Sequence, residues 1–230
     1  VLVQLALLRD KKTLNAHSVI ETLAMLGHSR VGALSLVKQG EAPRFDVGHA
    51  IEHLRAAEQA AQQIDQMDFG NVAPDEMGLL YLANAGTGVG GARPKALLFD
   101  DAGQYLAKFN RLNQDRYNNA RVELACLRMA QAAGILMKGG KVIEGINGRE
   151  VLLLDRVDID GQARKHLITV NGLLKEAASQ LDLGHAFRYD HVCDLIKKHS
   201  CHVEKDLIQL LKLMLFNRAI NNTDDHERNF

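Results

Sequence analysis

The sequence predicts an α+β protein in which a mixed α/β half precedes an all-helical half. Extended and helical patterns alternate up to about residue 157, whereas helical spacing of apolar residues dominates after about residue 165. Glycine and Asn-Gly turn signals separate the extended segments of the first half. We therefore expect an N-terminal lobe over residues 1–157 and a helical lobe over residues 158–230.

The first part of the chain predicts two helices with a strand between them. Residues 13–27 carry apolar side chains at helical spacing and end at Gly27. Residues 31–37 are apolar and predict a strand. Residues 47–66 predict a second helix, with an apolar face that begins at Ile51.

Two predicted strands and a helix follow. Residues 95–99 and 104–110 are the arms of a hairpin, because residues 100–103 have turn chemistry. Residues 119–133 predict a helix, after which Gly134 takes a left-handed conformation.

A second hairpin is the clearest in the chain. Residues 141–146 and 150–157 are its arms, and Asn147-Gly148 suits a type I′ turn. The remaining predicted elements are a turn at 158–161 and helices at about 171–180, 189–199 and 203–219.

Composition excludes several classes of protein. Lys+Arg and Asp+Glu number 28 each, which argues against a tail-driven binder of nucleic acid. Three cysteines are too few for a disulfide framework and indicate a cytoplasmic protein. We expect no membrane span. The sequence begins at Val1 rather than Met and stops in an apparent loop, so we expect a fragment of a longer protein.

The first chemical signal is a glycine-rich run over residues 86–95, in which positions 86, 88 and 91 fit G-x-G-x-x-G. Glycine lets backbone N–H groups approach a phosphate closely. Pro94 and the strand that follows argue against a Rossmann loop, which needs a helix there. A glycine loop between two strands is similar to the phosphate cover of protein kinases; the alternative is a simple hinge.

Two further signals favour the same chemistry. Lys108 lies among apolar neighbours one strand after the loop, and Glu123 in the next helix is a candidate partner. Residues 221–230 are a polar run after a long apolar helix, in which Asp224 precedes Asn229 by five residues. This is the spacing of the kinase catalytic loop. A snorkelling lysine and a solvated helix end are the alternatives.

On these residues the chain resembles the HipA family of bacterial serine/threonine kinases, the toxins of toxin–antitoxin pairs. The resemblance is carried by residues 90–95, 119–123 and 222–230. It implies a bilobal protein-kinase-like fold, truncated here, that transfers phosphate from ATP with Mg²⁺ to serine or threonine hydroxyls of proteins. Aminoacyl-tRNA synthetases are among the family's substrates. A DNA-binding antitoxin is the implied partner, and DNA is contacted only through it.

The resemblance also implies roles for individual residues. Asp224 would be the catalytic base, Asn229 would bind Mg²⁺, and Lys108 would hold ATP phosphates. The backbone at Asp155 and Val157 would meet adenine. The full set implied near the nucleotide is Gly90, Gly91, Ala92, Arg93, Pro94, Lys95, Lys108, Asp155, Arg156, Val157, His226, Glu227, Arg228 and Asn229.

Two departures from the family pattern leave room for functions other than protein phosphorylation. The regulatory serine of the family's glycine loop falls on Gly88, with Thr87 beside it. The second metal-binding Asp of kinases is not reached before residue 230, so we expect it farther along the protein. The alternatives are a catalytically impaired kinase-like binding module and a small-molecule kinase.

Two zinc patterns are weaker signals. His49, Glu52 and His53 fit H-x-x-E-H on a predicted helix. A second group consists of His191, Cys193, His199, Cys201 and His202. Surface histidines and buried thiols explain both more simply.

Overall fold

The computed structural model describes residues 20, 31–42, 48–66, 95–110, 115–161, 163–177, 188–226 and 229–230. The chain divides into two compact units. Unit 1 comprises Val1–Ala125 and Lys138–His166, and unit 2 comprises Cys126–Met137 and Leu167–Phe230. A sheet with helices in unit 1 and helices in unit 2 confirm the predicted α+β class. The domain boundary predicted after residue 157 stays a prediction, and the helix predicted at 13–27 lies outside the described residues apart from Ile20.

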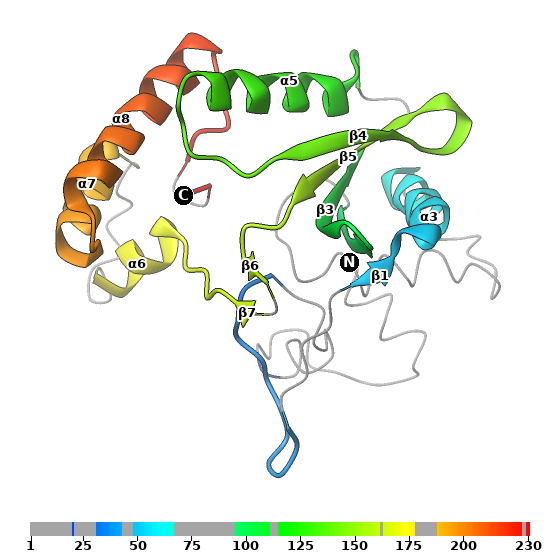
Figure 1. The fold of residues 1–230 in the computed structure, drawn as a ribbon, viewed down its shortest axis with the longest axis horizontal. Helices are drawn as coiled ribbons and strands as arrows, with labels where there is room; N and C mark the ends of the chain where they lie inside the picture. Colours follow the sequence, from blue (N-terminus) through cyan, green and yellow to red (C-terminus); the bar gives the residue numbers. More distant parts are fainter. Residues whose placement is uncertain are drawn as a thin grey trace. The chain divides into compact units, whose positions relative to one another are not determined.

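Unit 1 is built on a five-stranded sheet with the order β1-β2-β3-β5-β4 (Figure 1). The short strand β1 runs parallel to β2, and the other neighbours are antiparallel. Both predicted hairpins are therefore present, while the parallel edge strand was not predicted. The strands are β1 (His49–Ala50), β2 (Lys95–Asp100), β3 (Gly103–Phe109), β4 (Gly140–Glu144) and β5 (Glu150–Asp155).

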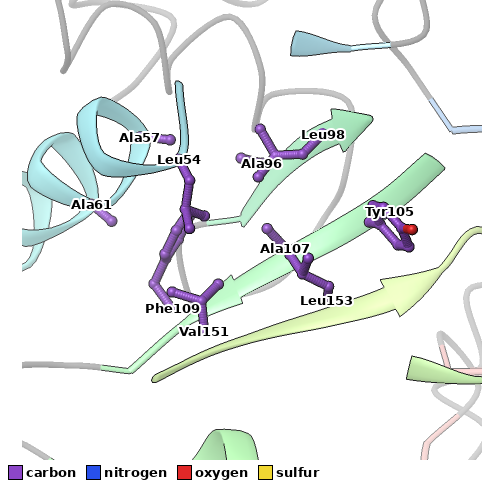
Figure 2. Close-up of a cluster of buried hydrophobic side chains, with 10 residues drawn as sticks. All are labelled: Leu54, Ala57, Ala61, Ala96, Leu98, Tyr105, Ala107, Phe109, Val151 and Leu153. Atoms are coloured by element: carbon purple, nitrogen blue, oxygen red, sulfur yellow. The ribbon is translucent and has the colours of Figure 1, made fainter. Parts of the chain in front are cut away.

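Helix α3 (Leu54–Gln66) packs on one face of this sheet. Small side chains at Ala57 and Ala61 let the helix backbone approach the strands closely, and Leu54 fills the space beside them (Figure 2). Burial of each large apolar side chain contributes about 1.5–3 kcal/mol. The cluster comprises Leu54, Ala57, Ala61, Ala96, Leu98, Tyr105, Ala107, Phe109, Val151 and Leu153.

The structure corrects two predictions near the start of unit 1. The helix predicted from residue 47 begins only at Leu54, after β1 and a 3-10 turn at Ile51–His53. Gly48, at φ +104°, brings the chain against β2, which favours strand pairing here over helix. The strand predicted at 31–37 is irregular, because the Gly32 N–H bonds to Asp158 rather than to a neighbouring strand.

The turn between β4 and β5 also differs from the prediction. The last pair is Glu144 with Glu150, so the connection has a 3-10 turn at Ile146–Gly148 instead of a two-residue type I′ turn. A tertiary contact explains this: the buried carboxylate of Glu58 on α3 accepts the Ile146 N–H at 2.5 Å. The strands then lead to a small hairpin of β6 (Ile159–Asp160) and β7 (Ala163–Arg164), which turns at Gly161.

Unit 2 is helical. Its helices are α6 (Val170–Ala177), α7 (Tyr189–His199), α8 (Val203–Ala219) and the second half of α5 (Asn119–Ala132). Gly134 follows α5 with φ +72°, which confirms the predicted left-handed end. Val170, Val192 and Leu210 form the buried centre of this unit. Within the part of the chain that the structure describes, every helix is too short or too polar to cross a bilayer.

Candidate functional site

The register of β2 and β3 places two lysines side by side. Lys95 is the cross-strand partner of Lys108. Their neighbours Ala96 and Ala107 belong to the core under α3, and successive side chains of a strand alternate between faces. Lys95 and Lys108 therefore lie on the sheet face opposite α3, where two adjacent cations favour an anion.

Lys108 has the partner that the sequence suggested. Its ammonium group bonds to the carboxylate of Glu123 in the first half of α5, and both residues belong to unit 1. The Lys108 side chain is 28% exposed and that of Glu123 is 43% exposed. The pair is open enough for Lys108 to meet a ligand while Glu123 holds it in place.

The start of α5 is fastened to the sheet, which positions Glu123. Asn118 caps the helix by accepting the Arg121 N–H, and Asn110 at the end of β3 accepts the Ala120 N–H. Glu150 at the start of β5 binds Asn118 and both Nε and Nη2 of Arg121. The bonds from Arg121 lower the pKa of Glu150, so it stays ionised at neutral pH. This cap was not predicted, although an Asn before a helix is a usual signal for one.

The expected hinge follows β5 in unit 1. The Asp155 N–H donates to the Gly139 carbonyl at 3.0 Å, and the Arg156 N–H donates to the Gln104 carbonyl at 3.1 Å. The side chain of Val157 is 53% exposed. These bonds fix the backbone at Asp155 and Arg156, directly before Val157.

A buried ion pair anchors the same segment. Arg156 donates to both carboxylate oxygens of Asp158, at 3.0 and 2.6 Å, and both side chains are about 1% exposed. Asp158 also accepts the Gly32 N–H, and Arg164 lies 3.7 Å away. The Arg156 side chain thus faces inward, and its bonds to Asp158 stabilise the backbone that follows β5.

The polar loop after α8 lies in unit 2, and hydrogen bonds between asparagines hold its first residues. Asn221 adopts φ +54°, a left-handed conformation that Asn tolerates better than most residues. The Asn222 N–H then donates to the Asn217 carbonyl at 2.8 Å, and the two side chains bond at 3.3 Å. The Asn222 side chain in turn accepts the Asp224 N–H at 3.1 Å.

The two adjacent aspartates of this loop have different surroundings. The Asp224 side chain is 83% exposed, and its carboxylate lies 3.2 Å from Nε2 of His226. Asp225 is half-buried and accepts the Tyr189 hydroxyl at 2.5 Å. An acceptor hydroxyl can reach only a carboxylate that faces solvent, so the geometry favours Asp224 over Asp225 as a base.

The hydrogen bonds of Asn229 leave its side-chain oxygen Oδ1 in a position to bind a cation. Its Nδ2 donates to the Asp224 carbonyl at 2.5 Å, and its N–H donates to the His226 carbonyl at 2.9 Å. With the amide nitrogen used in this way, Oδ1 is the acceptor atom of the side chain. An exposed amide oxygen fits Mg²⁺, which binds oxygen ligands and retains several waters.

Part of the predicted site lies outside the described residues. This holds for Gly90, Gly91, Ala92, Arg93 and Pro94 of the glycine loop, for Thr87 and Gly88, and for Glu227 and Arg228. The structure brings together Lys95, Lys108 and Glu123 in unit 1, and Asp224, His226 and Asn229 in unit 2.

Neither zinc pattern is assembled into a metal site among the residues that the structure describes. His49 lies in β1 and His53 ends the 3-10 turn, so the H-x-x-E-H segment is not one α-helix. Over the described ranges, no three His, Cys, Asp or Glu side chains gather closely enough to hold a metal ion.

Comparison with known proteins points to one family. Residues 87–230, more than half of the chain, match the model of the HipA-like C-terminal domain. The chain is also similar to a solved structure described as the Shewanella oneidensis MR-1 toxin–antitoxin system HipA, HipB and its operator DNA complex. The TM-score is 0.65 and the identity 18%, over 98% of this chain and 56% of that one. This likeness shows the fold, and among curated proteins none matches the chain.

Proposed function

The chain belongs to the HipA family, and on that premise we propose that it acts in ATP- and Mg²⁺-dependent phosphoryl transfer to a serine or threonine hydroxyl of a protein. The observation that carries the proposal is the loop at 222–230. There Asp224 is exposed while the amide of Asn229 is bonded to the Asp224 carbonyl. This bond ties the residue that would bind the cation to the backbone of the residue that would act as base.

Asp224 accepts the proton of the acceptor hydroxyl as the phosphoryl group is transferred. Its exposure leaves room for a protein substrate, and His226 at 3.2 Å orients the carboxylate. Transfer of this kind needs little covalent participation from the enzyme, so positioning of the hydroxyl provides much of the rate.

Lys108 and Lys95 bind the phosphates of ATP. Their positions side by side on one sheet face suit a polyanion, and Glu123 keeps Lys108 from turning to solvent. The backbone at Asp155 and Val157 binds adenine in this proposal. That the lysines of unit 1 and the loop of unit 2 meet at one nucleotide stays a prediction.

Asn229 Oδ1 would be one oxygen ligand of Mg²⁺, and a bound Mg²⁺ neutralises charge on the phosphates. The single amide oxygen calls for a further carboxylate ligand.

The partner is also a matter of proposal. The structural relative is described in a complex with HipB and operator DNA. We infer by analogy that this protein binds a DNA-binding antitoxin, contacts DNA only through it, and phosphorylates a protein such as an aminoacyl-tRNA synthetase.

The test is Asp224→Asn in the full-length protein, incubated with Mg²⁺, labelled ATP and cell lysate. We expect transfer to protein to fall by orders of magnitude while ATP binding persists. The matched control is Asp194→Asn, which changes an exposed aspartate of α7 and leaves transfer intact. Unchanged transfer by Asp224→Asn would refute the mechanism. Wild-type protein that binds ATP without making product would instead indicate a binding module, and label only in small molecules would indicate a small-molecule kinase.

A further inference from the structure

Tyr189, the first residue of α7, contacts the loop at 221–230 at two points. Its hydroxyl donates to Oδ2 of Asp225 at 2.5 Å. Its ring meets that of Phe230 edge to face, with centroids 5.7 Å apart and an interplanar angle of 83°. Asp225 directly follows Asp224, and Phe230 directly follows Asn229. One side chain therefore holds the neighbours of both proposed functional residues.

The hydroxyl contact belongs to a network that reaches Asp224. Asn217, buried at the end of α8, bonds both to the Tyr189 hydroxyl and to the side chain of Asn222. Asn222 in turn accepts the Asp224 N–H. Burial and the Asp225 carboxylate raise the pKa of Tyr189 to about 12, so the hydroxyl remains a donor at any physiological pH.

The ring contact fixes the other end of the loop. Phe230 packs against the buried centre of unit 2, and its carbonyl accepts the Val170 N–H at 2.9 Å. Asn229 lies between this anchored residue and its own bond to the Asp224 carbonyl. The position of the Asn229 side chain consequently depends on how Phe230 is seated.

Asp224 itself has little packing to fix it, because its side chain is 83% exposed. Its direction must come from the backbone on either side and from His226. The Asn222 side chain supplies one constraint before Asp224, and the bond between Asp225 and Tyr189 supplies the other just after it.

We propose that Tyr189 is a positioning residue that acts through Asp225 and Phe230 to hold the Asp224 carboxylate and the side-chain oxygen Oδ1 of Asn229 at a fixed spacing. This inference rests on the proposed function and adds to it a residue far from the loop in sequence. A displacement of about 1 Å at a reacting group costs roughly 100-fold in rate, so a small shift of the loop has a large kinetic effect.

Tyr189→Phe in the full-length protein is the first test, because it removes the hydroxyl and keeps the ring on Phe230. We expect kcat to fall roughly 10- to 100-fold, with the KM for ATP unchanged and the protein folded at the assay temperature. Tyr117→Phe is the matched control, since Tyr117 is 63% exposed, and it keeps the wild-type kcat. Wild-type kcat in Tyr189→Phe would overturn the proposal, as would a loss that only tracks the unfolded fraction.

The route through Asp225 has its own test. Asp225→Asn retains an acceptor for the Tyr189 hydroxyl and should keep most of the kcat that Asp225→Ala loses. If Tyr189 acts through Asp225, the double variant of Tyr189→Phe and Asp225→Ala is no slower than the slower single variant. Multiplied losses in the double variant would overturn this route.

Amide hydrogen exchange separates this proposal from the proposed function. In Tyr189→Phe, the amides of residues 221–226 should exchange faster than in the wild type, whether or not the protein transfers phosphate. An inactive wild type with this increase would refute the function and support the anchoring by Tyr189. An active wild type with unchanged exchange and kcat in Tyr189→Phe would refute the anchoring alone.

Discussion

Two lysines of the same sheet allow a sharp test of which face binds phosphate. Lys108 on β3 lies on the face opposite α3 and bonds to Glu123. Lys141 on β4 is opposite Leu153, a member of the α3 core, and bonds to Asp100 at 3.1 Å. Each lysine therefore has a carboxylate partner, but only Lys108 lies on the face that carries the proposed nucleotide. We predict that Lys108→Met abolishes most of the activity and that Lys141→Met does not.

The two variants should affect stability to a similar, small extent. The side chains of Lys108 and Glu123 are 28% and 43% exposed, and those of Lys141 and Asp100 are 44% and 21% exposed. Pairs this open contribute at most about 1 kcal/mol each to folding. Removal of a preorganised group that stabilises transition-state charge costs about 10²–10³ in kcat, or ~3–4 kcal/mol. In Lys108→Met the kinetic loss should therefore exceed the loss of folding free energy several-fold.

The assay combines phosphate transfer at saturating ATP with urea denaturation of both variants. Support for the prediction is a drop of at least 100-fold in Lys108→Met, near-normal kcat in Lys141→Met, and folding free energies within about 1 kcal/mol of the wild type. Equal activities in the two variants would refute a phosphate-binding role for Lys108. A large loss of stability confined to Lys108→Met would show that the pair with Glu123 is structural.

Two further predictions concern the folding of unit 1. Gly48→Ala should destabilise by about 2–4 kcal/mol, because the residue has φ +104° and a Cβ would lie 2.4 Å from the Leu97 carbonyl oxygen. Gly148→Ala has φ +70° but open space around it, so it should cost only about 1–2 kcal/mol, and equal costs in urea denaturation would refute the role of the close approach. Burial raises the pKa of Glu58, so the folded state binds its proton more tightly than the unfolded state. Wild-type stability should therefore fall relative to Glu58→Gln as pH rises above 4.5, and a difference that is constant with pH would contradict this reasoning.

Local patterns predicted many of the helices and strands well. Helices α7 and α8 begin and end where spacing and composition place them, at Tyr189–His199 and Val203–Ala219. The pairing of β2 with β3 follows from turn chemistry at Asp100, whose carboxylate accepts the N–H groups of Ala102 and Gly103. Such features depend on residues within a few positions of one another, and a sequence displays them directly.

Predictions failed where a distant residue competes for the backbone. The predicted strand at 31–37 is absent because the Gly32 N–H bonds to Asp158, 126 positions away. The predicted type I′ turn is replaced because Glu58 accepts the Ile146 N–H, 88 positions away. In both places the competing acceptor is a buried carboxylate, which must be satisfied when the chain folds.

The family was readable from the chain alone, and motif spacing singled out Asp224 and Asn229 as candidate site residues, since motif spacing is a property of sequence. Only the folded structure showed that Asp224 is exposed while Asp225 is half-buried, set Lys95 beside Lys108, and brought Tyr189 to the loop. The physical reason is that exposure, strand register and long-range contacts arise from packing. Tyr189 lies 36 positions from Asp225 in sequence, and their contact partly buries Asp225 while the adjacent Asp224 remains open to solvent.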